Sequence, residues 1–360
     1  MRRNRPAVIG QLPCTPGVYR FRDAGGRVLY VGRATTLRSR VASYWSDLRG
    51  REHLAPMVAR VAAIEAVACD SAHEAAWLER NLLQTSLPRW NRTPGGLESA
   101  VYIRMDARPA APGLFVVYRA EPAAQVRHFG PYLGRQRVRR AITALDRLLP
   151  LSSTGTRLSG TERDIARARG AVSADRSALT SSLTAILARE PAAVSDARSG
   201  LERLRDRAAG VLAYEMAARI QDEIVALDWV TCPQKVTTME PTNHTVSGWS
   251  SGILVQFQIS SGRVCTWSQR ACGMPGAARA LAATPHVWSD FMQRTAELAA
   301  NMTTAARGRL VDGVELDPVQ EGVVGDGPGV SGSPAEGFEV CFPGAADILL
   351  VDRGEGNQLD

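Results

Sequence analysis

The sequence predicts a mixed α/β (α+β) protein that begins with a short antiparallel sheet flanked by helices. Two β-branched and aromatic segments, GVYRFR and RVLYVG, flank the turn-like DAGG at residues 23–26. Apolar residues then recur at helical spacing after residue 36 and again after residue 71. Residues 201–230 show helical periodicity with a break at Gly210, which predicts a helical hairpin.

The first two segments predict a β-hairpin that brings two tyrosines together. If residues 23–26 form the loop, Arg22 pairs with Arg27, and Tyr19 lies directly opposite Tyr30. Directly opposed residues share one face of a sheet, with Cβ atoms about 5 Å apart. A tyrosine packing pair explains this pattern as well as a functional site does.

The first predicted helix carries arginines beside its apolar stripe. Leu37, Val41 and Tyr44 stand at i, i+4 and i+7, which is typical of an amphipathic helix. Arg38 and Arg40 flank this stripe. Such arginines usually face solvent, but one of them is able to lean over the tyrosine face.

The second predicted helix presents one glutamate that has no capping role. Ser71 and Glu74 fit a capping box, which gives Glu74 a structural task. Glu79 lies beside the apolar stripe and is free for another role. Pro88 ends the helix, and Asn91 follows it.

Charge is distributed unevenly along the chain. Residues 311–360 hold eleven acidic residues and one arginine, so a net charge of +7 leaves +17 on residues 1–310. This basic body favours a polyanion partner, most simply nucleic acid, although a solvated basic surface fits the charge equally well. Lys235 is the only lysine. A single arginine therefore says little about selection against lysine.

Composition favours a cytoplasmic protein. The six cysteines form no CxxC pair, so neither a zinc site nor a disulfide framework is expected. No apolar run approaches the roughly 18 residues needed to cross a membrane. The basic start of the chain is interpreted as a native N-terminus rather than a targeting signal.

Five motif positions then resemble a known nuclease family. Gly17-Val18-Tyr19, Tyr30-Val31-Gly32, Arg40, Glu79 and Asn91 match the GIY-YIG motif in order and spacing. The segments LPCTPGVYRFRDAGGRVLYVGRATTLRSRV, LERNLLQTSLPRWN and RHFGPYLG resemble the N-terminal half of the UvrC family, the incision subunit of bacterial nucleotide excision repair. This resemblance runs with gaps over residues 10–150 and resumes at 200–230.

The resemblance implies a metal-dependent phosphodiester hydrolysis. Glu79 is expected to bind Mg²⁺ or Mn²⁺, because one carboxylate, water and the substrate phosphate suffice for Mg²⁺. Arg40 is expected to clamp the scissile phosphate, with Arg33 and Arg38 also contacting DNA. The remaining expected catalytic residues act on the nucleophile or hold the site in register: Tyr30 as first candidate for the water, Tyr19 as its partner, and Asn91 through amide hydrogen bonds.

One motif position departs from the family. UvrC proteins commonly have lysine after YVG, where this chain has Arg33. Arginine keeps the charge but does not give up its proton. Catalysis therefore tolerates the change if the family's lysine only contacts phosphate.

The resemblance also divides the rest of the chain. The expected domains are the nuclease domain 1–95, a UvrC-like extension 96–150, a linker 151–195, a UVR-like hairpin 196–232, a partial UvrC-homology region 233–310 and an acidic, disordered tail 311–360. The linker corresponds to the iron–sulfur segment of the family, but 152–170 holds no cysteine, so no cluster is expected. Within 233–310, residues 251–267 predict strand, turn and strand, followed by an Ala-rich helix to about residue 307.

The hairpin segment YEMAARIQDEI resembles the motif through which UvrC meets UvrB, with Gln221 in place of the usual arginine. The resemblance implies that residues 201–230 bind a UvrB-like protein. The expected contact residues are Tyr214, Glu215, Ala217, Ala218 and Asp222. An ordinary amphipathic helix pair is the alternative.

The sequence thus favours a truncated UvrC-like endonuclease that makes the 3′-side incision in double-stranded DNA. Two other classes stay open. One is a non-catalytic repair adaptor that keeps the UvrB-binding hairpin. The other is a GIY-YIG nuclease recruited to another DNA-processing pathway. The intact motif favours catalysis, since an adaptor has no physical need for Glu79.

Overall fold

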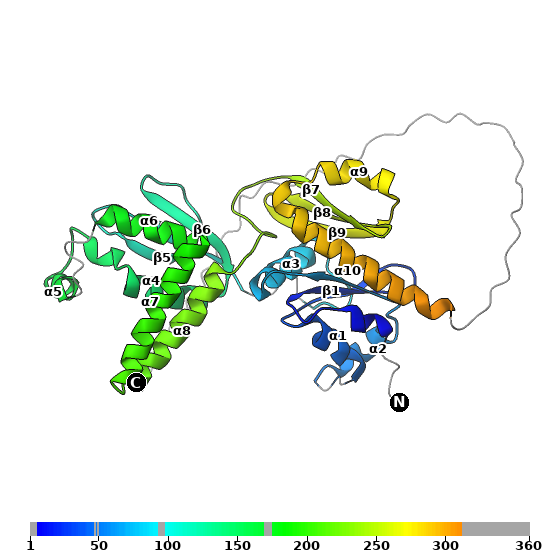
Figure 1. Cartoon of the computed structure of the whole chain (residues 1–360), viewed down its shortest axis with the longest axis horizontal. Coiled ribbons are helices and arrows are strands. Elements are labelled where there is room, and N and C mark those ends of the chain that lie inside the picture. Colours follow the sequence, from blue (N-terminus) through cyan, green and yellow to red (C-terminus); the bar gives the residue numbers. More distant parts are fainter. Residues whose placement is uncertain (1–5, 47, 49, 93–97, 169–174, 312–360) are drawn as a thin grey trace, which may run out of the picture. The chain divides into compact units, whose positions relative to one another are not determined.

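The computed structural model describes residues 6–46, 48, 50–92, 98–168 and 175–311 (Figure 1). These residues belong to one compact unit, which spans Met1–Val314. The acidic tail expected at 311–360 lies outside the described residues, apart from Val311. Within the described part of the chain, no helix is both long and apolar enough to cross a membrane.

The first sheet has the strand order β2-β1-β3, and both pairings of the central strand are antiparallel. Its core, together with short helices around it, buries Phe21, Leu37 and Tyr44. The elements of this part are η1 (Ala7–Gln11), β1 (Gly17–Arg22), β2 (Val28–Ala34), α1 (Leu37–Ser46), η2 (Glu52–Leu54), α2 (Ala55–Val58), β3 (Ala63–Ala68) and α3 (Ala72–Thr85).

The hairpin register differs by two residues from the expected one. Tyr19 lies opposite Gly32, and Tyr30 lies opposite Phe21, so the predicted direct Tyr19–Tyr30 pair is wrong. The loop explains the shift, because the Arg27 N–H donates to the Asp23 carboxylate at 2.8 Å and the strand pairing shifts after Phe21. A two-residue shift keeps each side chain on its face. The two tyrosine rings therefore still meet, with centroids 6.2 Å apart.

Helix α3 begins with the predicted capping box. The Ser71 hydroxyl accepts from the Glu74 N–H at 2.9 Å, and the Glu74 carboxylate accepts from the Asp70 N–H at 2.7 Å. The same carboxylate accepts from the Lys235 N–H at 2.8 Å. Glu74 therefore both caps its own helix and fixes a segment 161 residues away.

A second sheet, ordered β5-β4-β6, lies on helix α4 and the helices that follow. Its strands bury Val101, Ile103 and Met105 on the helix side. The elements are β4 (Ala100–Asp106), β5 (Gly113–Val117), β6 (Val126–Leu133), α4 (Arg135–Leu148), η3 (Leu151–Thr154), α5 (Gly160–Ala168), α6 (Arg176–Leu187), α7 (Pro191–Gly210) and α8 (Tyr214–Thr231).

Residues 151–195, interpreted from the sequence as a linker, instead contain α5, α6 and the start of α7. Helix α6 is part of the core, because Leu183, Ile186 and Leu187 are buried among the residues of α4 and α8. The predicted break at Gly210 is confirmed, since α7 ends there and α8 begins at Tyr214.

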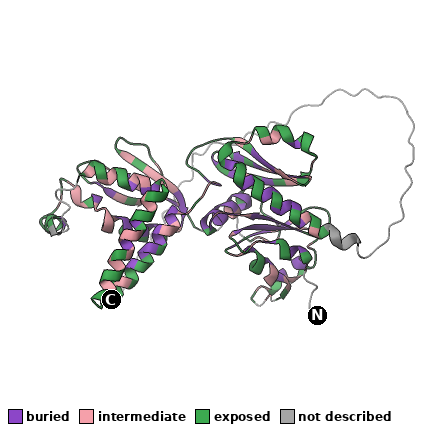
Figure 2. Ribbon diagram, in the orientation of Figure 1, coloured by how far each residue is buried: buried purple, intermediate pink, exposed green. Residues whose placement is uncertain are grey.

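The third sheet, ordered β7-β8-β9, shares a core with the first (Figure 2). Val18 of β1, Trp77 of α3 and Val255 of β8 belong to one buried cluster with Phe291. The elements are β7 (His244–Ser250), β8 (Ile253–Ser260), β9 (Arg263–Ala271), α9 (Met274–Ala282) and α10 (His286–Val311). The predicted strand-turn-strand is confirmed as β8 and β9. The single helix expected to follow is wrong, because two helices, α9 and α10, take its place.

Candidate active site

A cleft of about 700 Å³ opens between β2, α1 and α3. Tyr30 and Arg33 reach it from β2, Arg40 from α1 and Glu79 from α3. Four of the residues singled out in the sequence therefore line one cleft. Its other lining residues are Ala34, Thr35, Thr36, Ser39, Ser43 and Arg51.

Three tyrosines, not two, form the floor behind the cleft. The Tyr19 and Tyr44 hydroxyls lie 2.7 Å apart in a hydrogen bond, and both side chains are buried. The Tyr30 ring lies 6.1 Å from that of Tyr44 and is only partly buried. Tyr30 is therefore the tyrosine that reaches the cleft, with Tyr19 behind it.

Burial suppresses ionisation of these phenols. It raises the pKa of Tyr19 well above the ordinary value of 10.0, and the neighbouring phenols of Tyr44 and Tyr30 add to the shift. Burial also raises the pKa of Tyr30, while Arg40 acts in the opposite direction with a smaller effect. Both phenols are neutral near pH 7 in the protein as described.

Glycine makes room for this arrangement. A Cβ on Gly32 would lie 2.6 Å from the Tyr19 hydroxyl oxygen and 2.7 Å from Cε1 of Tyr30. A Cβ on Gly17 would lie 2.2 Å from the Val67 carbonyl oxygen. Both motif glycines therefore mark close approaches that no larger residue permits without movement.

Glu79 and Arg33 form a pair at the edge of the cleft. The Arg33 N–H donates to one carboxylate oxygen of Glu79 at 3.1 Å, and Arg33 Nε lies 3.3 Å from the other. The Glu79 side chain keeps a fifth of its surface exposed. Burial raises the pKa of Glu79, and Arg33 and Arg40 oppose that shift. Glu79 thus points one accessible carboxylate into the cleft.

Asn91 holds strand β2 in place. Its side-chain oxygen accepts from the Val31 N–H at 3.0 Å, and its Nδ2 donates to the Val31 carbonyl at 2.8 Å. This reciprocal pair fixes the strand that carries Tyr30 and Arg33. Asn91 itself does not line the cleft.

The two arginines of α1 separate. Arg40 lines the cleft, with its guanidinium carbon 5.7 Å from the Tyr44 ring centroid. Arg38 is directed elsewhere, because its Nε donates to the Leu12 carbonyl at 2.6 Å. Arg38 therefore does not share the cleft with Arg40 and Arg33, because residues two apart on a helix point roughly 200° away from each other. The expected contact of Arg38 with DNA stays a prediction.

Sequence reasoning missed Tyr44 and Arg51. Tyr44 was assigned to the apolar stripe of α1, yet it lies four residues after Arg40 and so shares its side of the helix. The signal in the sequence that could have marked Tyr44 is its hydroxyl group on an otherwise apolar stripe. Arg51 lies 5.0 Å from the Tyr44 ring centroid and lines the cleft. No pattern in the sequence marks Arg51.

The cleft suits a cation that takes few protein ligands. Among the described residues, no three His, Cys, Asp or Glu side chains cluster as a ligand set. A single carboxylate beside an open, arginine-lined cleft fits Mg²⁺ or Mn²⁺ with waters and a phosphate as the other ligands. The chemistry of Glu79 therefore fits the metal that the motif implies.

The expected partner-binding residues lie along the start of α8. Tyr214, Glu215, Ala218 and Asp222 are exposed, and Ala217 is half-buried. Asp222 lies 3.7 Å from Arg140 of α4. The apolar end of the hairpin faces solvent, with Val211, Leu212 and Tyr214 between 65% and 72% exposed.

An antiparallel sheet with Tyr19 and Tyr30 on one face, an arginine-bearing helix and a lone glutamate together define a GIY-YIG domain. A sequence model described as the UvrC-like GIY-YIG domain matches residues 15–92. The chain therefore carries a UvrC-like GIY-YIG domain at residues 15–92.

Relatives that match well beyond this domain agree with the assignment. The UvrABC system protein C of Mycobacteroides abscessus is 32% identical over 301 residues, which are 76% of this chain and 43% of the relative. That of Desulforudis audaxviator is 30% identical over 237 residues, which are 64% and 38% of the two chains. The chain thus spans about two fifths of the length of these relatives.

A solved structure is also similar over the first domain. It is the GIY-YIG N-terminal endonuclease domain of UvrC from Thermotoga maritima, bound to its catalytic divalent cation, magnesium. The sequences are 28% identical, and the match covers 26% of this chain and all of the other, with a TM-score of 0.23.

Proposed function

We propose that the chain is a metal-dependent DNA endonuclease that hydrolyses a phosphodiester bond in nucleotide excision repair. The observation that carries this proposal is the meeting of Glu79, Arg40 and Tyr30 in one cleft. The UvrC-like domain at residues 15–92 supports the same reaction. We place this activity in the cytoplasm, as the cysteine usage of the chain favours.

Glu79 holds the divalent cation in this proposal. When bound, Mg²⁺ or Mn²⁺ lowers the pKa of a bound water and neutralises charge on the phosphate. Arg33 keeps Glu79 ionised through the 3.3 Å contact between its Nε and the carboxylate. We propose no iron–sulfur cluster for this chain, because residues 152–170 lack the cysteines that would bind one.

The arginines bind the scissile phosphate. Arg40 and Arg33 reach the cleft from two different elements, so their guanidinium groups are able to contact one phosphate from two sides. A guanidinium fork matches two phosphate oxygens and stabilises the charge that develops there. Arg51 adds a third cation to the same cleft.

Tyr30 orients the attacking water. It is partly buried and lines the cleft, whereas Tyr19 is enclosed and bonded to Tyr44. Because its pKa is raised, Tyr30 acts first as a neutral hydroxyl that holds the water by a hydrogen bond. Proton removal by Tyr30 requires the additional positive charge of the metal and phosphate-bound arginines. Tyr19 and Asn91 position Tyr30 and its strand.

A nicking assay on plasmid and lesion-bearing duplex tests the proposal. We expect nicking with Mg²⁺ or Mn²⁺ and a loss of several orders of magnitude in Glu79→Gln, because the carboxylate that holds the metal is gone. Glu297→Gln, an exposed glutamate on α10, is the matched control and should behave as wild type. Undiminished cleavage by Glu79→Gln would contradict the metal-binding role of Glu79, whereas no cleavage by wild type would favour the non-catalytic adaptor.

The exposed end of the α7–α8 hairpin supports a UvrB-like partner. Val211, Leu212 and Tyr214 present apolar surface to solvent at this end. With that partner the proposed product is one nick on the 3′ side of a lesion, which strand-specific end-labelling would show. A 5′ incision that persists in Glu79→Gln would contradict this assignment.

A binding experiment tests the partner. Leu212→Ser and Tyr214→Ser should abolish association with the C-terminal end of UvrB in calorimetry at low salt. Val225→Ser changes an exposed apolar side chain elsewhere on α8 and should bind as wild type does. Failure of the wild-type chain to associate would favour a nuclease recruited to another pathway.

A further inference from the structure

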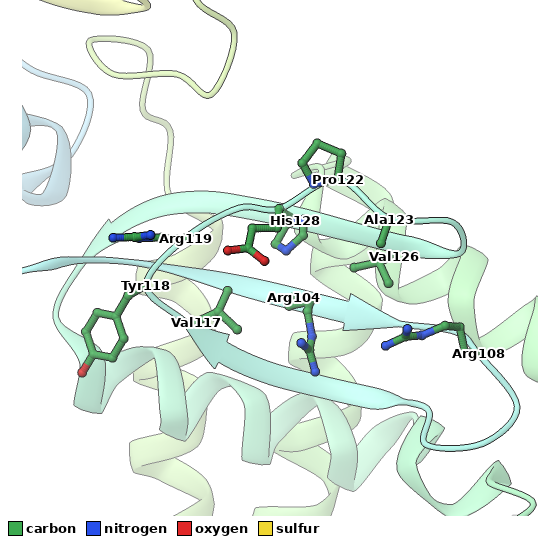
Figure 3. A pocket seen from close by; sticks show the side chains of 10 residues that line it. Arg104, Arg108, Val117, Tyr118, Arg119, Pro122, Ala123, Val126 and His128 are labelled. Atoms are coloured by element: carbon green, nitrogen blue, oxygen red, sulfur yellow. The ribbon is translucent and has the colours of Figure 1, made fainter. Parts of the chain in front are cut away.

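One face of the sheet β5-β4-β6 has no helix or strand over it among the described residues. Alternate residues of β4 are buried against the helices, whereas Tyr102 and Arg104 point to the other side. The register places Phe115 and His128 beside Arg104 on that side. A hollow of about 470 Å³ lies there. Figure 3 shows Arg104, Arg108, Tyr118 and Arg119 among the side chains that line it. We call this surface the open sheet face.

Guanidinium groups lie close to the two exposed aromatic rings of the open sheet face. The guanidinium carbon of Arg104 lies 4.8 Å from the Phe115 ring centroid, and that of Arg135 lies 5.7 Å from Tyr118. Phe115 is 37% exposed and Tyr118 is 54% exposed. Exposed rings on a sheet offer stacking platforms for bases, and guanidinium planes stack in the same way.

The charges on this face are available for an anion. Asp106 pairs with Arg108, but within the described residues Arg104 and Arg119 form no ion pair with a carboxylate. The Arg104 Nε is buried and has no hydrogen-bond partner in that part of the chain. Glu121 is the one acidic residue that lines the hollow, against three arginines. The balance is therefore positive, as a phosphate backbone requires.

Shared lining residues connect the open sheet face with the cleft of the active site. Tyr118 also lines a second hollow of about 580 Å³, together with Arg135, Arg137 and Arg33. Arg33 in turn lines the active-site cleft beside Glu79. Three neighbouring hollows, joined by Arg33 and Tyr118, therefore lie between Glu79 and the sheet.

We propose that the open sheet face binds unpaired nucleotides of the DNA strand next to the bond that is cut. This inference rests on the proposed function for the identity of the polymer. Stacking on Phe115 and Tyr118 requires bases that have left the duplex, because paired bases present only their edges. Arg104 and Arg119 bind the phosphates between the stacked bases, and Arg135 and Arg137 lead the strand toward Arg33.

Fluorescence anisotropy of the full chain with a labelled oligothymidine of about 12 nucleotides tests the proposal. Working in EDTA removes the metal and any cleavage, so the result does not depend on activity. We expect wild type to bind. The double variant Phe115→Ser/Tyr118→Ser should bind at least roughly tenfold more weakly, because it lacks both rings on which bases are proposed to stack. Glu297→Gln, the exposed control on α10, should bind as wild type does.

Matched variants separate the site from general charge. Arg104→Ala and Arg119→Ala should weaken binding, whereas Arg139→Ala on the exposed side of α4 should have a smaller effect. A thermal melt checks that each variant folds. The proposal would be overturned if wild type did not bind oligothymidine, or if the double variant bound it as tightly as wild type. It would also be overturned if the chain preferred intact duplex and these substitutions did not affect that binding. If the wild-type chain bound oligothymidine but did not nick DNA, the proposed nuclease function would be overturned and the proposed binding face would stand.

Discussion

The guanidinium carbon of Arg20 lies 3.8 Å from the ring centroid of Trp267, although 247 residues separate them in the sequence. Arg20 is buried in β1 and pairs with Glu65 of β3. Its Nη1 also donates to the Trp267 carbonyl at 2.5 Å. Burial lowers the pKa of Arg20 to about 10, and Glu65 opposes that shift. The third sheet thus covers a charge pair of the nuclease domain.

Trp267→Ala should destabilise the whole unit. Removing the indole leaves a cavity over a buried cation, and such changes cost about 3–5 kcal/mol in the free energy of unfolding. Urea denaturation measures the loss. A double-mutant cycle with Arg20→Met should show coupling, whereas the same cycle with Trp249→Ala, a partly buried tryptophan of β7, should be additive. Additive behaviour in both cycles would contradict the contact.

Gly32→Ala should damage both stability and nicking. The added Cβ would lie 2.6 Å from the Tyr19 hydroxyl, so the buried tyrosine cluster must shift. We expect a loss of about 1–3 kcal/mol, typical of overpacking, and a fall in nicking rate. Gly10→Ala is the control, because nothing lies within 4 Å of its Cβ position. A variant with wild-type melting and nicking would show that the tyrosines tolerate displacement.

Arg33→Gln should bind Mn²⁺ more tightly while nicking more slowly. Its guanidinium repels a cation at Glu79, and two charges about 4 Å apart interact by roughly 1–4 kcal/mol between water and a protein surface. We expect an affinity gain on the order of tenfold in calorimetry at pH 8. Arg38→Gln should leave the Mn²⁺ affinity unchanged, since Arg38 bonds to the Leu12 carbonyl away from Glu79. Weaker Mn²⁺ binding would indicate that Arg33 matters mainly by keeping Glu79 ionised.

Stability should fall with acid through His73. Its Nε2 accepts from Trp77 Nε1 at 3.1 Å and from the Leu133 N–H at 3.2 Å, so the ring is neutral. Burial lowers its pKa from 6.5 to about 3, with Arg189 and Arg137 contributing. A depressed folded-state pKa gives stability that is present above pH 6.5 and is lost toward pH 3, by up to about 1.4 kcal/mol per pH unit.

Denaturation of wild type and His73→Gln at several pH values between about 6.5 and 4 measures this contribution. The variant should lose less stability per pH unit, because no imidazole resists protonation. His53→Gln, an exposed histidine, should keep the wild-type slope. Parallel slopes for wild type and His73→Gln would rule out the buried neutral ring as the cause.

Several features followed from the sequence because they depend on neighbouring residues. The hairpin of β1 and β2, the cap of Ser71 and Glu74, and the break after Gly210 each rest on contacts a few residues apart. The motif spacing also identified Tyr30, Arg40 and Glu79, which the structure brings into one cleft. Local hydrogen bonds and periodicity carry this information.

Tertiary structure decided the rest, because the relevant contacts join distant segments. The Asp23 loop and the irregularity after Phe21 set the register that places Tyr19 over Gly32. Arg38 turned to Leu12, whereas Tyr44, assigned to the core, became the hydroxyl partner of Tyr19. Pairing a buried Arg20 with Trp267 required the third sheet to fold against the first. No local pattern encodes such a contact, since its free energy appears only when both segments exclude water together.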